Sequence, residues 1–340
     1  MAVVSFQYMD QAFDITLTDS VEFLSSNNES GTNYSFLTTG GDDWEVYGSG
    51  FTFAGGLPTA GTVTGVDVDL DNDGGAVNQE IAITGLSLPV TSLGVGVGTA
   101  EEQRDKFWAA VLGGADTFDF TMTSYVNSFW FSGDGASVND GGLHVGANDM
   151  FNDGGAALTN FSVIAGDYSD IVAGVAVGGA DQFTVGAYLV SGDFISIDPG
   201  AAGIGGDDRI TPARLANTTY VQARLFIEGD ADVVLGALQG GNDLIDLRST
   251  NVASVTQVIR LVGDALIVSG SGALLAGNDT IHGSSVAEEI YGDYLSSAGY
   301  VVGGKDRLFG YGGNDTMRGN EGRDQLYGGD DDDTLNGGID

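Results

Sequence analysis

Aspartate recurs every nine residues in the C-terminal part of this chain. The stretch divides into the units VVGGKDRLF, GYGGNDTMR, GNEGRDQLY and GGDDDDTLN, starting at residue 301. Aspartate occupies the sixth position of each unit (Asp306, Asp315, Asp324 and Asp333), and an apolar residue occupies the eighth. Carboxylates are hard oxygen ligands, and glycine-rich turns bring backbone carbonyls close to an ion. This chemistry predicts Ca²⁺ sites at the turns.

The repeat also predicts a geometry. The first six residues of a unit form the turn, and the last three form a short strand whose middle side chain enters the core. Two units complete a coil of 18 residues, so Asp306 and Asp324 are expected on one side of the coil, and Asp315 and Asp333 on the other. The turn residues predicted to contribute to the metal sites are Gly304, Gly313, Asn314, Gly322 and Asp331.

These units resemble the RTX (repeats-in-toxin, haemolysin-type) calcium-binding family over residues 274–340. The resemblance implies a β-roll with Ca²⁺ bridging successive turns, type I secretion without a cleaved N-terminal signal, and folding in external calcium. Two departures weaken individual sites. Unit 319–327 carries Asn320 and Glu321 near its start, and unit 301–309 lacks its opening glycine pair.

Looser units continue the pattern upstream. LLAGNDTIH places Asp279 in register, GSSVAEEIY has Glu288 in place of aspartate, and residues 292–300 have the right length but the wrong residues, which predicts a bulging loop. Glycine-turn aspartates also occur at Asp116, Asp181, Asp208 and Asp243, with spacings that include 27, 35 and 36 residues. Residues 113–273 are therefore predicted to form an irregular β-solenoid that leads into the regular roll at 274–340.

The N-terminal part has a different pattern. Apolar residues alternate with polar ones between glycine-rich turns, which predicts an all-β, sandwich-like domain over residues 1–100. Residues 101–112 are predicted to form a capping helix, because Thr99 and Glu102 have capping-box spacing and Gly113 follows as a stop. The fold class is therefore all-β, an N-terminal β-rich domain followed by a parallel β-solenoid that ends in the roll.

Residues 69–80 match the EF-hand loop expression, with Asp69, Asp71, Asp73 and Glu80 at ligand positions. Both flanks alternate like strands, whereas an EF-hand needs helices. A Ca²⁺ site on a β-turn and a solvated acidic hairpin are both open. Gly40 to Asp43 precede another strand pattern and fit either a Ca²⁺ turn or a plain turn.

Composition limits the partners. The 340 residues carry a net charge of −37, with 11 basic and 48 acidic side chains. Nucleic acids and anionic membranes need a basic face, so neither is an expected partner. Such self-repulsion opposes folding, and bound Ca²⁺ offsets it. The chain has no cysteine and no apolar run long enough to span a membrane.

Signals for catalysis are weak. The only histidines are His144 and His282, and neither lies in a metalloprotease motif. The chain has no G-x-S-x-G elbow and no cysteine nucleophile. Arg209, Arg214 and Arg224 are expected to form structural ion pairs, with phosphate binding as the alternative.

The function expected is that of a secreted, non-enzymatic calcium-binding protein that self-assembles into a surface layer, sheath or filament, with cell-surface polysaccharide as a further partner. The alternative is the calcium-binding portion of a larger secreted adhesin or enzyme. Because the last repeat stops at Asp340, the active part would then lie beyond this residue or within residues 1–110.

Overall fold

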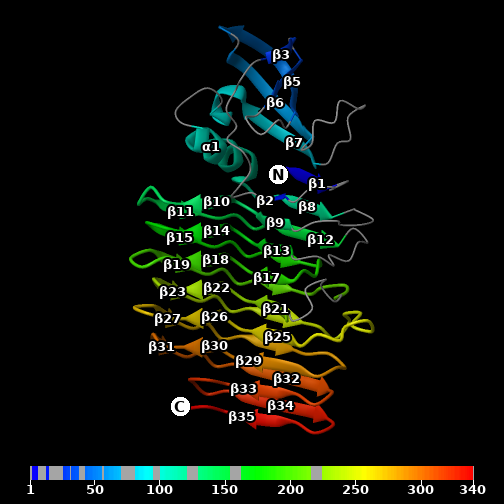
Figure 1. Ribbon diagram of the computed structural model, residues 1–340, viewed down its shortest axis with the longest axis vertical. Helices are drawn as coiled ribbons and strands as arrows, with labels where there is room; N and C mark the ends of the chain where they lie inside the picture. The colour runs from blue at the N-terminus through cyan, green and yellow to red at the C-terminus, as the bar shows by residue number, and fades with distance from the viewer. Residues whose placement is uncertain are drawn as a thin grey trace.

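The computed structural model describes residues 2–6, 13–14, 26–30, 32–37, 43–55, 57–69, 81–94, 100–120, 129–153, 162–215 and 224–339. Its main body consists of two stacks of strands side by side, with the N-terminal strands and helix above them (Figure 1). The strands of successive coils pair in parallel, which confirms the predicted β-solenoid.

Four parallel sheets build the solenoid. Sheet 1 contains β8 (Thr117–Phe120), β12 (Met150–Asp153), β16 (Gln182–Phe183), β20 (Arg209–Ile210), β24 (Leu244–Asp246), β28 (Thr280–His282), β32 (Arg307–Gly312) and β34 (Gln325–Asp330). Sheet 2 contains β9 (Phe129–Ser132), β13 (Ser162–Ala165), β17 (Leu189–Ser191), β21 (Leu225–Glu228), β25 (Ile259–Val262), β29 (Glu288–Tyr291), β33 (Thr316–Arg318) and β35 (Thr334–Asn336), with the short β2 (Phe13–Asp14) at its edge.

The other two sheets have six strands each. Sheet 3 contains β10 (Gly135–Val138), β14 (Tyr168–Ile171), β18 (Phe194–Ile197), β22 (Ala231–Val234), β26 (Ala265–Val268) and β30 (Tyr294–Ser297). Sheet 4 contains β11 (Leu143–Val145), β15 (Val175–Val177), β19 (Ala202–Ile204), β23 (Ala237–Gln239), β27 (Ala273–Leu275) and β31 (Tyr300–Val302).

Each wide coil therefore has two lobes. The chain passes through sheets 1 and 2, crosses to sheets 3 and 4, and then returns to sheet 1 of the next coil. Separate apolar cores fill the two lobes. We call the line along which the lobes meet the seam; it is formed by the crossing turn before sheet 3 and the return turn before sheet 1.

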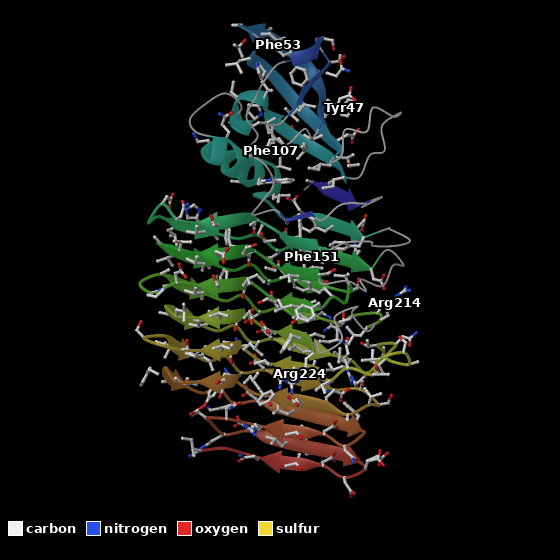
Figure 2. The ribbon with its side chains drawn as sticks, in the orientation of Figure 1. Tyr47, Phe53, Phe107, Phe151, Arg214 and Arg224 are labelled. Carbon is white, nitrogen blue, oxygen red and sulfur yellow. The ribbon has the colours of Figure 1, made fainter. Side chains whose placement is uncertain are left out.

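The first lobe is filled by apolar side chains that lie in register along the stack. In sheet 1, the rings of Phe118 and Phe151 stack with centroids 4.7 Å apart, and those of Phe151 and Phe183 with centroids 4.5 Å apart. Ile210, in register with Phe183, continues the row. Phe151 is fully buried inside this stack (Figure 2).

The solenoid narrows at its C-terminal end. From β32 onward a coil contains only sheets 1 and 2, so Leu308 pairs with Leu326 and Met317 with Leu335 at the predicted interval of 18 residues. Residues 292–300 are not the bulging loop that we expected. They hold β30 and the start of β31, because the second lobe continues for one more coil before it ends.

The N-terminal part extends sheet 1. Strands β3 to β7 form an antiparallel meander, and β1 joins it to β8 by pairing antiparallel with β7 and parallel with β8. These strands are β1 (Val3–Phe6), β3 (Ser26–Glu29), β4 (Asn33–Leu37), β5 (Asp43–Ala54), β6 (Leu57–Asp69) and β7 (Ile81–Pro89). Within the described ranges we see no second sheet facing this meander, as a sandwich would require.

Helix α1 (Ala100–Leu112) and the 3-10 turn η1 (Val90–Leu93) pack at this end of the solenoid. The apolar side of α1 is buried, with Phe107, Trp108, Val111 and Leu112 in the core. The expected capping residue Thr99 lies outside the described residues. Because α1 contacts β10, it covers the first strand of sheet 3, where a solenoid needs an end cap.

Candidate metal centre

A continuous row of aspartates lines the return turns of the seam. Its members are Asp116, Asp149, Asp181, Asp208, Asp243, Asp279, Asp306 and Asp324, and we call it the first row. The backbone N–H of each member donates to Oδ1 of the member in the next coil, at 2.6–3.0 Å. The same bond thus joins the wide coils and the narrow coils.

A shorter row lies on the opposite side of the narrow coils. The Glu288 N–H donates to Asp315 Oδ1 at 2.9 Å, and the Asp315 N–H donates to Asp333 Oδ1 at 3.0 Å. Asp306 and Asp324 therefore stack on one side and Asp315 and Asp333 on the other, as predicted. Glu288 occupies the register position expected for it.

The second carboxylate oxygen has no protein donor in seven members of the first row. Oδ2 is buried without a hydrogen-bond partner in Asp116, Asp149, Asp181, Asp208, Asp243, Asp279 and Asp306, and the same holds for Asp315 on the opposite side. A buried carboxylate oxygen without a donor or a cation costs several kcal/mol, on the order of the desolvation of the charge. Seven such oxygens in register along the first row call for a common partner.

Burial raises the pKa of these carboxyl groups, and the neighbouring carboxylates raise it further. The pKa reaches about 6 in Asp116, about 9 in Asp149 and about 8 in Asp306, and it is well above 3.8 in Asp181 and Asp208. Desolvation is the largest cause in each case. Burial in the seam therefore disfavours the ionised form of these carboxyl groups unless a cation neutralises their charge.

Glycine at the crossing turn leaves room for that cation. A Cβ on Gly166 would lie 1.7 Å from the Gly192 carbonyl oxygen and 2.0 Å from Asp181 Oδ2. The narrow coils repeat this arrangement, because a Cβ on Gly319 would lie 2.3 Å from Asp324 Oδ2 and 2.7 Å from a carbonyl oxygen of the next coil. A carboxylate and a carbonyl oxygen thus converge in each coil on space that only glycine leaves open.

This donor set fits Ca²⁺, which takes carboxylate and carbonyl oxygens in flexible geometry. Over the described ranges, no three His, Cys, Asp or Glu side chains gather around one point. The sites must therefore combine carboxylates with backbone carbonyls, which is the arrangement that the cradles at Gly166 and Gly319 show.

The structure brings most of the predicted ligands together. Asp116, Asp181, Asp208, Asp243, Asp279, Asp306 and Asp324 lie in the first row, and Asp315 and Asp333 lie opposite. Gly304 and Gly322 lie in return turns of the seam: a Cβ on Gly304 would be 3.0 Å from Asp306 Oδ1, and one on Gly322 would be 3.4 Å from Asp324 Oδ1.

Other predicted residues lie elsewhere. The Gly313 N–H donates to Asp331 Oδ2 at 3.2 Å, and the Asn314 side chain accepts the Asp332 N–H at 3.2 Å, both at the exposed surface. Asp69 ends β6, and Asp71 and Asp73 lie outside the described residues. Strands rather than helices flank that loop.

Sequence reasoning missed Asp149, which continues the first row between Asp116 and Asp181 at spacings of 33 and 32 residues. The signal was present, because the turn GAND precedes a strand as the other turns do. It also missed the crossing turns, where glycine-aspartate pairs such as Gly166–Asp167 and Gly192–Asp193 recur after sheet 2.

His144, His282 and Arg214 have structural contacts. His144 contacts Asp140 at 2.9 Å, and His282 stacks on Phe309 with ring centroids 4.8 Å apart. Arg214 forms an ion pair with Asp153 at 2.9 Å, at the outer edge of sheet 1 (Figure 2). For Arg214, this contact confirms the prediction of a structural ion pair.

Comparison with known families supports the calcium site. The model of the RTX calcium-binding nonapeptide repeat (4 copies) matches residues 302–340. No match was found among the curated proteins or the solved structures. None of the described helices is long and apolar enough to cross a membrane. The matched residues form the narrow coils whose aspartate rows and glycine cradles suit Ca²⁺, and this part of the chain therefore carries RTX-type calcium-binding repeats.

Proposed function

We propose that the chain is a secreted structural protein that folds when it meets external Ca²⁺ and then associates with copies of itself. The first row carries this proposal. Seven buried carboxylates from Asp116 to Asp306 have an oxygen without a hydrogen-bond partner, and a cation that binds only the folded coils converts its binding free energy into folding free energy.

An extracellular setting suits such a protein. Extracellular calcium modules bind with dissociation constants of about 10⁻⁴–10⁻³ M, which external calcium satisfies. A chain without cysteine has no disulfides to hold it together outside the cell. Cations along the seam would take that role, and the RTX repeats at residues 302–340 support export.

The outer face of sheet 4 supports self-association. Two positions per strand face outward, and across the six strands they are Leu143, Val145, Val175, Val177, Ala202, Ile204, Ala237, Gln239, Ala273, Leu275, Tyr300 and Val302. We call this set the apolar face. It carries no charge, and its end strands are the most open, with Leu143 at 67 % and Tyr300 at 65 % exposure.

A second copy is the partner that we propose for this face. At a net charge of −37, two copies repel over most orientations. The apolar face is a surface without acidic side chains on which two copies can meet and bury apolar area. Repeated contacts between copies would build an extended assembly.

A calcium titration of EDTA-treated protein tests the proposal. We expect circular dichroism to show β-structure, and light scattering to show particles, as Ca²⁺ is added. Leu143→Ser should reduce scattering without changing the Ca²⁺ dependence of folding, whereas Val258→Ser, at an exposed site outside the apolar face, should change neither.

The outcomes separate the parts of the proposal. Folding without association would leave the calcium role standing and favour the calcium-binding portion of a larger secreted adhesin or enzyme. Secondary structure that does not depend on Ca²⁺ would overturn the proposal as a whole.

A further inference from the structure

A second row of aspartates faces the first row across the seam. In each wide coil, aspartate follows the glycine of the crossing turn directly before sheet 3. The members are Asp134, Asp167, Asp193, Asp230, Asp264 and Asp293. Each is almost completely buried, with at most 3 % exposure. None of the six lies within the residues that the RTX model matches.

Each member of the second row accepts an N–H from the return turn of its own coil. The Gly179 N–H donates to Asp167 Oδ2 at 2.9 Å, and the Gly241 N–H donates to Asp230 Oδ1 at 2.9 Å. This contact alone does not require aspartate, because the amide oxygen of asparagine accepts one N–H equally well. The recurrence of aspartate, rather than asparagine, at this position in all six wide coils therefore needs another cause.

The carboxylates of successive coils face each other. A Cβ on Gly178 would lie 1.6 Å from Asp193 Oδ1 and 3.0 Å from Asp167 Oδ2. The same convergence occurs at Gly205, where the nearest oxygens belong to Asp230 at 1.7 Å and Asp193 at 2.9 Å. Carboxylate oxygens that meet in a buried site repel each other unless a proton or a cation lies between them.

Several oxygens in this row have no donor at all. Asp167 Oδ1, Asp230 Oδ2 and Asp264 Oδ2 are buried without a hydrogen-bond partner. The two rows also interact, because the charge of Asp167 raises the pKa of Asp181 and that of Asp230 raises the pKa of Asp243. The wide coils therefore offer two carboxylates per coil at the seam.

We propose that the second row binds Ca²⁺, so that a file of cations bridges successive coils along the seam of the wide solenoid. This inference rests on the calcium-dependent folding proposed above. The ligands are carboxylate oxygens, and without nitrogen or sulfur they suit a hard divalent cation. In the narrow coil, Asn320 takes the register position after Asp293, so the row ends where the second lobe ends.

Counting bound ions tests the second row. The variants are the double substitution Asp193→Asn with Asp230→Asn in the second row, Asp208→Asn in the first row, and Asp207→Asn as the control. Asp207 is exposed, and its partner Asn242 shows that the chain uses asparagine at this position of the turn. Native mass spectrometry and equilibrium dialysis of the full chain in Ca²⁺ give the ions per chain.

We expect the double variant to keep its β-structure and to lose at least one bound Ca²⁺ per chain, while the control keeps the wild-type number. An unchanged number in the folded double variant overturns the inference. If the first-row variant alone loses an ion, the second row fails as a calcium site but calcium-dependent folding stands. If the wild-type protein binds no Ca²⁺, both proposals fail.

A measurement on the unaltered chain covers the case in which the double variant does not fold. Crystals grown in Ca²⁺ should give anomalous-scattering peaks between Asp167 and Asp193 and between Asp193 and Asp230. Peaks confined to the first row and to the narrow coils would overturn the inference.

Discussion

Replacing Asp149 by asparagine should change stability in a way that depends on calcium. Asp149 Oδ1 accepts the Asp116 N–H at 2.7 Å, and the amide oxygen of asparagine can keep this bond. Oδ2 is the buried oxygen without a partner, near the Gly166 carbonyl oxygen. Asparagine puts an uncharged N–H donor there, which removes the charge and the ligand together.

The magnitude follows from the pKa of Asp149, which burial raises from 3.8 to about 9. At pH 7 the unfolded chain ionises this group, whereas the metal-free folded chain holds it protonated. Roughly three pH units at about 1.4 kcal/mol each set an upper limit of about 4 kcal/mol for the cost of folding the aspartate. Without Ca²⁺, Asp149→Asn should therefore be more stable than the wild type by up to that amount.

Calcium should reverse this advantage. A bound ion stabilises the wild type by about 2.7 kcal/mol at a concentration of 100 times the dissociation constant and by about 4.1 kcal/mol at 1,000 times. The advantage of Asp149→Asn thus shrinks by about 1.4 kcal/mol per tenfold rise in free Ca²⁺. The two stability curves should cross near a thousandfold excess over the dissociation constant.

Urea unfolding at a series of buffered Ca²⁺ concentrations measures both curves, with Asp207→Asn as the control that removes the same charge at an exposed position of a return turn. A stability difference between Asp149→Asn and the wild type that stays constant across the series would show that Asp149 is not a ligand. A variant that is less stable than the wild type in EDTA would refute the argument from burial.

Three further changes test the seam and the core. Gly166→Ala should lower the free energy of unfolding in Ca²⁺ by about 1–3 kcal/mol, because its Cβ would lie 1.7 Å from a carbonyl oxygen. Gly114→Ala is the control, because its Cβ would meet nothing within 4 Å, and it should leave the stability unchanged. Urea unfolding measures both variants. After calcium removal, thermal melts should show the highest stability near pH 4 and a falling stability toward pH 8. Burial raises the pKa of Asp149 to about 9 and of Asp306 to about 8, so ionising these groups as the pH rises costs folding free energy. A stability that rises with pH over this range would contradict this argument. Phe151→Ala should cost about 3–5 kcal/mol in urea unfolding, because the ring is fully buried between two stacked rings; a loss below about 1 kcal/mol would mean that the stack does not support the first lobe.

The narrow coils could be predicted from the sequence because their spacing is constant. Asp306 and Asp324 are 18 residues apart and lie one coil apart in the structure. In the wide coils the same row has spacings such as 27 and 35 residues, between Asp181, Asp208 and Asp243. The hydrogen bond from coil to coil fixes the row in space, while loops of different length separate its members along the chain.

The second lobe could not be predicted by a search for period nine. It is inserted between the crossing glycine and the return turn, as between Gly166 and Gly179. This insertion splits the repeat unit, so that its first residues and its aspartate no longer lie within nine residues. For the same reason residues 292–300 read as a loop, although Tyr294–Ser297 form a strand.

The hydrogen bonds of the first row give the molecule a direction. In each of these hydrogen bonds, the donor N–H belongs to one coil and the accepting carboxylate to the next coil toward the C-terminal end. At the N-terminal end the row closes on the Ala2 N–H, which donates to Asp116 Oδ1 beside β1. At the other end, β34 and β35 are the last strands of sheets 1 and 2 (Figure 1). The rod is therefore polar along its axis, and copies that stack head to tail along it would all point the same way.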